Sequence, residues 1–520
     1  MPGVTPVRVR KPMPLKGRFT ALPADAIGDD FSPGGINVRF RFGEVRSAPG
    51  RDIFAGPAFG GENSLNLTRF QLFDTTEWVL QLTKSRLFRF GFGAPGVPRE
   101  WHNVPKNIPP NPLGTRVWST AVGENHFFFA RGEEIFQWNG NALSAYDVIT
   151  PTSGTVPKAR FLAYFNNRLI AGFVQEGGNT FANRIRWSQN GDFTKWDDTV
   201  GLGAGFLDFM DVDELEIRGM LPLQNVLVVY TKFAIINVFP TGSLDPTFGA
   251  SVAVRGTGLN APYTLVSNGQ RHFYLGYDRN VYSWDGTQLV AIGNPILEEL
   301  RAFTIPGNMD LYTAGLSRNR QEYWLIVEDN NVFIYDYERD YWTRDSFPSI
   351  STVAEIDDTV NLLTWTTITG RWLQQKKTWS ELVASTIAVL IAGRSDSATM
   401  LIDDSVIYDY FAIGSIMDRY VETPDYYFED VMETGSVMRM LLIYGVTNTD
   451  PFEVGVSVDR GFSWKTQLVT PSSNGLSLID FNITGEVVRF RFRENSATAQ
   501  FRWRSMEYEF APGGTFIGSV

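Results

Sequence analysis

The side chains that could perform chemistry are few in this chain and lie far apart in the sequence. The 520 residues include no cysteine, which excludes disulfides, thiolate metal sites and a cysteine nucleophile. The three histidines, His102, His126 and His272, lack the spacing of metal ligands. No Gly-Lys pair of a phosphate-binding loop, no G-x-S-x-G elbow and no H-E-x-x-H motif occurs. We therefore expect no catalytic, metal or cofactor-binding residues and no cofactor, and we interpret the protein as a non-enzyme.

Acidic residues form clusters that could act as paired carboxylates. Such groups can serve as a glycosidase dyad or a calcium site, but a chain with 57 acidic residues contains clusters of this kind by chance. The glycine-rich stretch 201–205 lacks the spacing of a dinucleotide-binding turn and is predicted to be a loop. The acidic clusters are Asp208, Asp211, Asp213 and Glu214, and separately Asp403 and Asp404.

The most specific local motif is S-x-D-x-G-x-S-W at residues 457–464, the Asp-box pattern of sialidase-like propellers. In a hairpin turn of this kind we expect Asp459 to accept backbone N–H bonds, Gly461 to adopt positive φ and Trp464 to pack beneath. An Asp box is an element of the fold and not a catalytic site. Its single occurrence, outside the repeats described below, argues against a sialidase.

Arginines alternate with apolar residues from Val488 to Arg493. This alternation predicts a strand with one buried face. Over residues 489–504 the alternating arginines could hold carboxylates or phosphates, but we expect a solvated face of a sandwich. In the last strand the parity of the alternation changes at Arg504 and Ser505, which predicts a β-bulge.

These residues must be positioned by a protein of the all-β class, because the chain is rich in aromatic residues, glycine and proline. Residues 273–293 are the cleanest copy of a unit of short strands and tight turns, and residues 127–148 and 325–347 are further copies. Antiparallel units that recur at about 40–50 residues are typical of a β-propeller. A large meandering sandwich would use the same strands and turns. We predict about seven blades, with six or eight as alternatives, near residues 65–104, 113–148, 159–213, 217–258, 262–303, 310–350 and 353–421.

Two stretches have helical features. Asn294 suits an N-cap, Pro295 suits the first helical position, and an apolar stripe runs from Ile296 to Phe303. A second helix is possible over residues 380–392, although residues 387–391 also fit a buried strand.

Three domains are predicted: an N-terminal arm with docking strands (1–55), a β-propeller-like domain (56–421) and a C-terminal β-sandwich domain (422–520) with six strands. The arm is basic, since residues 1–51 hold nine Lys and Arg against four Asp and Glu. Its strand after Gly35 places Val38, Phe40 and Phe42 on one face. We expect Arg39 and Arg41, on the other face, to contact a neighbouring component of an assembly.

The N-terminal residues have positive charges but no apolar run behind them, so we expect no secretory signal. The longest apolar run, near residues 387–392, is far too short to span a membrane. We therefore expect a soluble protein that is made in a cytoplasm.

Three features together resemble a known family. They are the strand and turn Asn37-Val38-Arg39-Phe40-Arg41-Phe42-Gly43, the following Arg46-Ser47-Ala48-Pro49-Gly50, and blades with the pattern Val281-Tyr282-Ser283-Trp284-Asp285-Gly286. This combination is similar to the tail nozzle and tail-hub proteins of short-tailed bacteriophages, including the packaged-DNA stabilisation type.

The resemblance implies a structural virion protein, made in the host cytoplasm, that forms a homo-oligomeric ring at the distal end of a short tail. A hexamer is implied, as are contacts with a tail adaptor or head-to-tail connector and with tail fibres or spikes. Double-stranded DNA would pass through the lumen without sequence-specific binding. Two alternatives remain: a carbohydrate-binding or carbohydrate-active propeller, and a generic propeller scaffold for other proteins.

Overall fold

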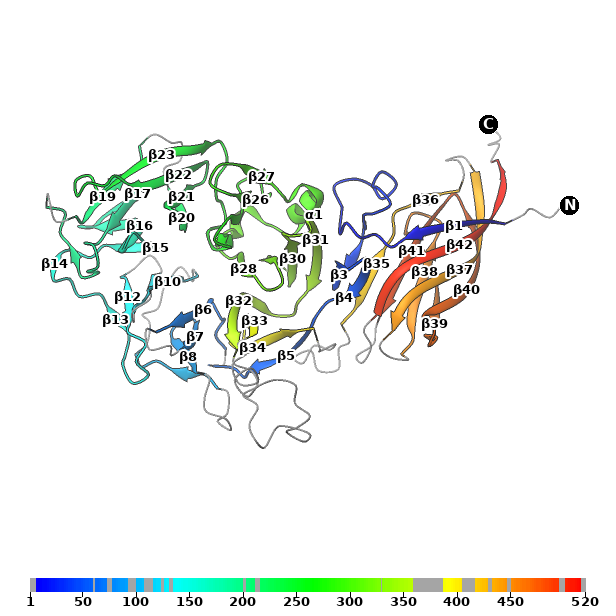
Figure 1. Ribbon diagram of the computed structural model, residues 1–520, viewed down its shortest axis with the longest axis horizontal. Coiled ribbons are helices and arrows are strands. Elements are labelled where there is room, and N and C mark those ends of the chain that lie inside the picture. The colour runs from blue at the N-terminus through cyan, green and yellow to red at the C-terminus, as the bar shows by residue number, and fades with distance from the viewer. Residues whose placement is uncertain are drawn as a thin grey trace, which may run out of the picture.

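The computed structural model of the chain consists almost entirely of β-structure arranged in two parts (Figure 1). One part contains seven four-stranded antiparallel sheets, and the other contains two six-stranded sheets. The first part is a seven-bladed β-propeller and the second is a β-sandwich, which confirms the predicted fold class. The structure describes residues 6–58, 61–72, 77–91, 100–106, 116–122, 126–130, 134–199, 203–210, 216–328, 330–358, 387–404, 417–428, 433–446, 450–494 and 501–515.

Six blades are built from strands that follow one another in the sequence, close to the predicted units. Blades one to three contain β6 (Asn66–Gln71), β7 (Glu77–Leu82), β8 (Leu87–Gly91) and β9 (His102–Asn103), then β10 (Trp118–Val122), β11 (His126–Ala130), β12 (Phe136–Trp138) and β13 (Asp147–Val148), then β15 (Lys158–Phe165), β16 (Arg168–Glu176), β17 (Asn179–Trp187) and β19 (Gly205–Asp208). Blades four to six contain β20 (Ile217–Leu223), β21 (Val226–Thr231), β22 (Ala234–Pro240) and β23 (Phe248–Arg255), then β24 (Val266–Ser267), β25 (His272–Leu275), β26 (Val281–Trp284) and β27 (Leu289–Ala291), then β28 (Thr313–Ser317), β29 (Glu322–Ile326), β30 (Asn331–Asp336) and β31 (Tyr341–Ser346). A short parallel pair, β14 (Ser153–Gly154) and β18 (Lys195–Trp196), accompanies the third blade.

The seventh blade takes its fourth strand from the N-terminal part of the chain. It contains β32 (Ile350–Asp358), β33 (Ile387–Arg394) and β34 (Thr399–Asp403), and β34 pairs with β5 (Gly50–Ala55). The predicted unit 353–421 was therefore wrong at its end. Residues 387–391 form a strand and not a helix, while residues 380–386 lie outside the described residues.

The innermost strands of consecutive blades contact one another all the way round, so the propeller is a closed ring. Aromatic rings fill the space between neighbouring blades, which is where much of the aromatic content is used. The ring pairs that cross blade boundaries include Phe54–Phe90 (4.7 Å between centroids), Phe70–Trp138 (6.0 Å), Trp118–Phe161 (5.0 Å), Tyr230–Tyr274 (5.0 Å) and Phe273–Tyr323 (5.5 Å).

The sandwich contains all six predicted C-terminal strands together with four strands from the N-terminal segment. One sheet has the order β3-β4-β42-β37-β40, with β1 also paired to β42, and the other has the order β2-β35-β41-β38-β39, with β36 also paired to β41. The bounds are β1 (Val7–Pro12), β2 (Gly35–Ile36), β3 (Val38–Arg41), β4 (Glu44–Ser47), β35 (Arg419–Glu422), β36 (Tyr426–Tyr427), β37 (Glu433–Val446), β38 (Phe452–Ser457), β39 (Lys465–Val469), β40 (Leu476–Gly485), β41 (Val487–Glu494) and β42 (Phe501–Thr515).

Side-chain alternation in the sandwich follows the sequence pattern. Val488, Phe490 and Phe492 are fully buried between the two sheets. The predicted bulge is present, because Ile443 pairs with Ser505 and Tyr444 pairs with Trp503, which leaves Arg504 without an opposite residue. The register therefore shifts at the place where the parity changes.

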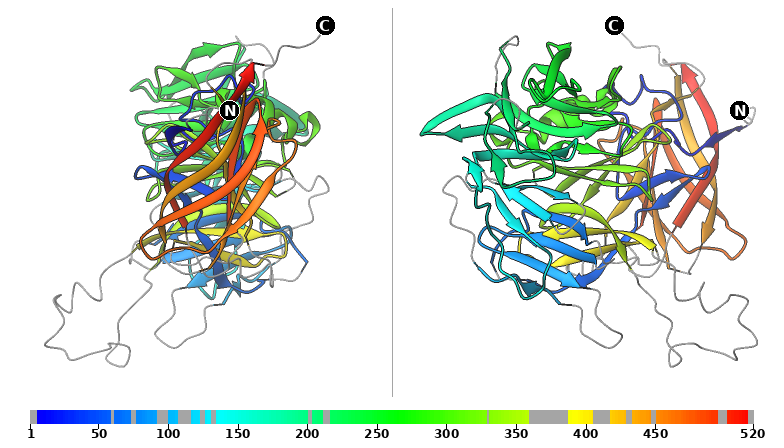
Figure 2. Two further views of the ribbon diagram at one scale, coloured as in Figure 1. Left: turned by 90° about the vertical axis from the view of Figure 1, so that its right-hand side faces the viewer. Right: turned by 60° about the vertical axis from the view of Figure 1, so that its left-hand side comes forward.

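The expected division of the chain, with a separate arm over residues 1–55, is corrected, because the described part of this segment, residues 6–55, does not stand apart from the two domains. Strands β1 to β4 belong to the sandwich and β5 belongs to the propeller, so the segment runs through both parts. In Figure 2 the blue N-terminal strands lie among the orange and red C-terminal ones. The physical reason is that the edge strands of the two C-terminal sheets have unpaired backbone groups, and the N-terminal strands supply hydrogen-bond partners for some of them.

The predicted helix after blade five is present as a 3-10 turn, η2 (Asn294–Ile296), followed by α1 (Leu297–Ala302). Ile296 and Leu300 are fully buried, as the apolar stripe predicts. Asn294 makes no capping hydrogen bond and instead accepts one from the Asn280 side chain at 2.8 Å. Two further 3-10 turns are η1 (Pro262–Thr264) and η3 (Pro306–Asn308). Among the described residues no helix is long and apolar enough to cross a membrane.

Candidate functional site

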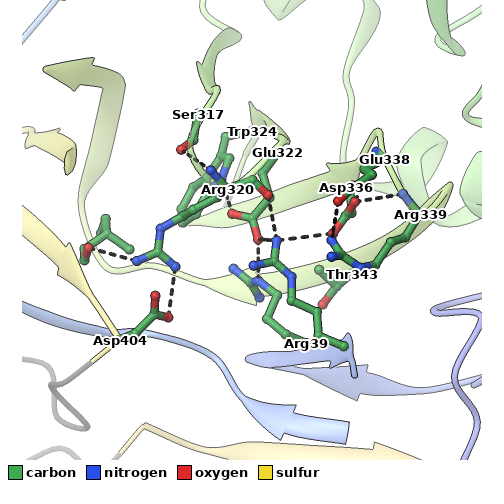
Figure 3. A network of polar contacts seen from close by, with 12 residues as sticks. Arg39, Ser317, Arg320, Glu322, Trp324, Asp336, Glu338, Arg339, Thr343 and Asp404 are labelled. Atoms are coloured by element: carbon green, nitrogen blue, oxygen red, sulfur yellow. Dashed lines mark hydrogen bonds and ion pairs between the residues drawn. The ribbon is translucent and has the colours of Figure 1, made fainter. Parts of the chain in front are cut away.

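A buried network of ion pairs joins the sandwich to blade six and is centred on two arginines of β3 (Figure 3). Arg39 donates to both carboxylate oxygens of Asp345 at 2.8 Å each and to Glu322 at 3.2 Å. Arg41 donates to Glu322 at 2.9 Å and to Asp336 at 3.2 Å. All three carboxylates belong to blade six, whereas β3 is hydrogen-bonded into the sandwich. The network therefore holds the two parts of the molecule together, and we call it the interdomain joint.

The charges of the interdomain joint balance inside the protein. Arg339 adds a third guanidinium, 3.1 Å from Asp336, so three arginines face three carboxylates. Glu322 also accepts a hydrogen bond from the Trp324 indole at 2.9 Å. Burial by itself would lower the pKa of Arg39, but Asp345 and Glu322 outweigh that effect and hold the pKa above its ordinary value. Buried charges paired in this way are costly to break, because removing one partner leaves the other uncompensated.

A second ion-pair group fixes the segment before β2 against the propeller. Arg18 donates to the two carboxylate oxygens of Glu299, in α1, at 2.5 and 2.8 Å. Arg344 of β31 donates to the same carboxylate at 2.6 Å. The backbone of Gly17 has φ +82°, and a side chain there would collide with the Trp342 carbonyl at 2.8 Å. The chain therefore needs glycine at this position, where its backbone packs directly against β31 of blade six.

Asn37 fixes the backbone at the start of β3. It adopts left-handed φ of 56°, donates from its amide to the Asp418 carbonyl at 2.7 Å and accepts from the Ser346 N–H at 3.1 Å. One side chain thus links the N-terminal segment, the strand β35 region and blade six. Asparagine tolerates this conformation better than most residues. Asn37, Arg39 and Arg41, which contribute to the family resemblance, all take part in joining the two domains.

The predicted outward role of Arg39 and Arg41 was wrong, because their partners lie in the same chain. Phe42 also departs from the expected pattern. It stands at the tip of the β3–β4 turn, 73% exposed, whereas Val38 and Phe40 are buried. The Arg46 guanidinium lies 4.6 Å from the centre of its ring.

The arginines of β41 are not a simple solvated face, which corrects that expectation. Each pairs with a carboxylate of the segment around β35 and β36, at 2.6–3.1 Å. These pairs fasten the connection between the propeller and the sandwich to β41. The pairs are Arg489 with Asp425, Arg491 with Glu422 and Arg493 with Asp418.

The Asp box has the expected geometry. Asp459 accepts from the Ser463 N–H at 2.9 Å and also from the hydroxyl groups of Ser463 and Ser457. These hydrogen bonds lower the pKa of Asp459 to about 2. Gly461 has φ +89°, and Trp464 donates to its carbonyl at 3.0 Å while covered by the Arg491 guanidinium. The carboxylate is thus engaged within its own turn.

The central channel of the propeller is narrow and is crossed by Arg116. A cavity of about 170 Å³ lies between the innermost strands, with a mostly apolar lining. The Arg116 guanidinium donates to the carbonyls of Leu311 at 2.7 Å and Ser351 at 2.8 Å, which come from blades six and seven. Desolvation lowers the pKa of Arg116 to about 10. A duplex about 20 Å wide cannot pass through such a channel, so any DNA conduit would have to lie between several copies of the chain.

Beside Arg116, four charged residues of blades three, four and six form a small ion-pair group. Arg160 pairs with Asp310 at 2.9 Å and Glu216 at 3.4 Å, and Arg218 pairs with the same two acids at 3.5 and 3.6 Å. Each acid is therefore shared by two arginines. Together with Arg116, the group contains three guanidinium groups and two carboxylates.

The other residues considered from the sequence do not form a site. His272 is buried, bonds to the Tyr230 hydroxyl at 2.8 Å and has its pKa lowered by burial to about 4. No group of three potential metal ligands occurs within the described ranges. Asp208 pairs with Arg184 and Asp404 with Arg320, so these acids have partners of their own. Asp211, Asp213, Glu214 and residues 201–202 lie outside the described residues.

Sequence reasoning missed the acidic half of the interdomain joint. Glu322, Asp336 and Asp345 lie near strand ends in blade six, where acids are ordinary. The only sequence feature that pointed to the interdomain joint is in β3. There two arginines alternate with apolar residues, and the structure shows that both faces of the strand are covered.

Comparisons with known proteins give likeness in structure only. No family model matches the chain, and no curated protein matches its sequence. A structure described as RRP9 WD40 repeats has a TM-score of 0.39 and 10% identity, covering 69% of this chain and 99% of that one. A structure of U3-55K has a TM-score of 0.39 and 9% identity, covering 68% and 99%. One of a mitotic checkpoint complex has a TM-score of 0.34 and 10% identity, covering 66% and 90%. Similarity at this level carries no functional assignment.

Proposed function

We propose that the protein is a structural component of a virion, a tail nozzle or hub that forms a homo-oligomeric ring at the end of a short phage tail. In this role it provides the channel for DNA ejection and helps to retain packaged DNA. The observation that carries the proposal is the interdomain joint. The residue types in the Asn37 to Gly43 motif, from which the resemblance starts, are the ones that lock the propeller to the sandwich.

A two-domain body with a fixed relative orientation suits the subunit of a ring that must keep its shape under mechanical stress. Only Ala48 and Pro49 connect β4, which pairs with β42 in the sandwich, to β5, which pairs with β34 in the propeller. Separation of the two parts is limited by this short connection and would expose the buried charges of the joint. The relative orientation of the two parts is therefore fixed by covalent connection, strand pairing and ion pairs together. A subunit of fixed shape gives a ring of defined size, which a flexible pair of domains would not.

Exposed apolar side chains lie at the two ends of the long axis, which supports a ring. One group belongs to blades three and four and the other to β39, β40 and the Asp-box turn (Figure 1). Two different surfaces that contact each other head to tail generate a closed ring when the rotation closes. We assign both surfaces to a second copy of the chain. The propeller surface contains Phe206, Met210, Phe239 and Leu244, and the sandwich surface contains Phe462, Leu468, Leu476 and Leu478.

The proposed partners follow from the same role. They are further copies of the chain, with a hexamer implied by the resemblance, a tail adaptor or head-to-tail connector, and tail fibres or spikes. Double-stranded DNA would pass through the lumen of the ring. The carbohydrate-binding alternative lacks a convergent set of aromatic and acidic side chains in the part of the chain that the structure describes.

Negative-stain electron microscopy and light scattering of the purified full-length chain test the proposal. Rings are expected, and Met210→Asp or Leu468→Asp should each prevent ring closure while leaving the circular dichroism spectrum of the folded chain unchanged. A mixture of the two variants should form dimers, since each keeps one intact surface. Leu143→Asp, at an exposed leucine outside both surfaces, is the matched control. A chain that stays monomeric at high concentration and binds glycans would overturn the proposal.

A further inference from the structure

A cleft of about 450 Å³ opens on the face of the propeller where the loops of blades four and five meet α1. We call it the cationic cleft. Its charged and aromatic lining comes from the β21–β22 turn, the β25–β26 turn, the last turn of α1 and the start of β20. The residues are Lys232, Tyr277, Asp278, Arg279, Arg301 and Arg218.

The lining contains four cations and one carboxylate. That carboxylate, Asp278, accepts hydrogen bonds from residues that follow it closely in the chain. Asp278 accepts from the Tyr282 hydroxyl at 2.9 Å and from the Asn280 N–H at 3.1 Å. Arg218 shares its two acids with Arg160, as described above. Arg301 pairs with Glu298 at 3.3 Å on the exposed side of α1. The local excess of positive charge contrasts with a chain whose net charge is −11.

Arg279 is held in place by neutral groups. Its Nη1 donates to the carbonyls of Arg301 and Thr304 at 3.0 Å each. None of the carboxylates in the described ranges pairs with it. Carbonyl acceptors orient a guanidinium without cancelling its charge, so Arg279 is prearranged for an anion.

One wall of the cationic cleft is aromatic. Tyr277 is 49% exposed, its ring meets that of Phe233 at 4.8 Å, and the Lys232 ammonium lies 4.8 Å from its centre. Pro306 and Met309 add apolar surface. The cleft thus combines cations with a surface on which a planar or sugar-like body can rest.

We propose that the cationic cleft binds the phosphate group of a small phosphate monoester, with the organic body against Tyr277. A phosphate monoester carries between one and two negative charges near neutral pH and offers three strong acceptor oxygens. A ligand with a phosphate group therefore fits a cleft with several cations better than a ligand with a single carboxylate group. Arginine forks match phosphate geometry, and lysine adds a point charge. A nucleotide and a phosphorylated sugar share this chemistry. The site is independent of the ring proposal.

Isothermal titration calorimetry with AMP, glucose 6-phosphate and inorganic pyrophosphate tests the site at low ionic strength. At least one of the two esters is expected to bind, while adenosine and glucose are not. Preference for AMP would identify a nucleotide site, and preference for glucose 6-phosphate a sugar-phosphate site. Absence of binding by both esters at millimolar concentration would overturn the proposal whether or not pyrophosphate binds, as would equally tight binding of adenosine or glucose.

Charge-matched variants locate the binding. Arg279→Gln should weaken the affinity for the preferred ester by about tenfold or more, as loss of a charge-assisted contact does. Arg271→Gln, at the opposite end of β25 on an exposed turn, removes the same charge and should leave the affinity unchanged. Lys232→Gln provides a second test if Arg279→Gln does not fold. An equal loss in the Arg271 control would mean that the general field of the protein, and not the cleft, attracts the ligand.

Discussion

Arg39 and Asp345 form a two-pronged ion pair, with both guanidinium Nη atoms 2.8 Å from a carboxylate oxygen, although 306 positions separate them in the sequence. Arg39 lies in a strand of the sandwich, and Asp345 lies in the last strand of blade six. Both side chains are buried. The pair therefore couples the folding of two domains that are otherwise built around separate cores.

Breaking this pair should destabilise the protein strongly. Arg39→Met leaves Asp345 buried without its ion-pair partner and leaves Glu322 with Arg41 alone, and the expected loss is about 3–5 kcal/mol in the free energy of unfolding. Arg8→Met is the control, because the ion pair of Arg8 with Glu509 is on the surface, and its loss should cost less than about 1 kcal/mol. Urea unfolding measures both. Equal stability of the two variants would contradict the proposed role of the joint.

The sequence predicted features that depend on neighbouring residues and missed contacts between residues that lie far apart in the chain. Alternation from Val488 to Arg493 located β41, and the parity change at Arg504 located the bulge, because both depend on adjacent residues. The pairing of β5 with β34 and of Arg39 with Asp345 joins positions more than 300 residues apart. No periodicity records such contacts. The basic character of residues 1–51 follows directly from the sequence, but the sequence does not show that Arg18, Arg39 and Arg41 pair with carboxylates of the same chain.

Closure of the propeller by β5 can be tested with an engineered disulfide. Asp52 and Leu401 are directly paired across antiparallel strands, at a separation compatible with a disulfide, in a chain that has no other cysteine. The double variant Asp52→Cys/Leu401→Cys should cross-link on oxidation and raise the melting temperature, because a long loop is closed. Non-reducing electrophoresis detects the bond. Asp52→Cys/Asp403→Cys, displaced by two residues along β34, should not cross-link efficiently, and the opposite order of yields would contradict the register.

Asp459 should matter for stability and not for activity. Asp459→Ala removes several turn hydrogen bonds and should cost about 1–2 kcal/mol. Its folded pKa, about 2, lies below the ordinary value of 3.8, so its contribution is present above pH 4 and is lost as the pH falls towards 2. The stability difference between wild type and variant should shrink over that range in thermal unfolding. A variant with unchanged melting temperature and lost glycan binding would favour the carbohydrate alternative.

Glu494 should give the opposite pH dependence. It is buried with Arg419 beside the Ser47 hydroxyl, and burial raises its pKa from 4.5 to about 7, although Arg419 lowers it. The folded state therefore binds a proton more readily than the unfolded state between these values, and stability falls as the pH rises through them. Glu494→Gln should remove this dependence, with an effect of at most about 3 kcal/mol. If the free energy of unfolding changed with pH in the same way in wild type and variant, the raised pKa of Glu494 would be contradicted.

The charge distribution predicts that the assembled protein does not hold duplex DNA. Residues 52–520 contain 37 Lys and Arg against 53 Asp and Glu. Duplex DNA carries one negative charge per about 1.7 Å of axis, and a protein that grips it must neutralise several phosphates in a row. The cationic cleft is large enough for one phosphate-bearing group, and Arg18, Arg39 and Arg41 are already paired inside the chain. An acidic lumen would repel phosphates from its wall and let the duplex slide. Fluorescence anisotropy with a labelled duplex at physiological salt should therefore show no measurable binding, whereas tight binding with a steep salt dependence would indicate a clamp and contradict the conduit.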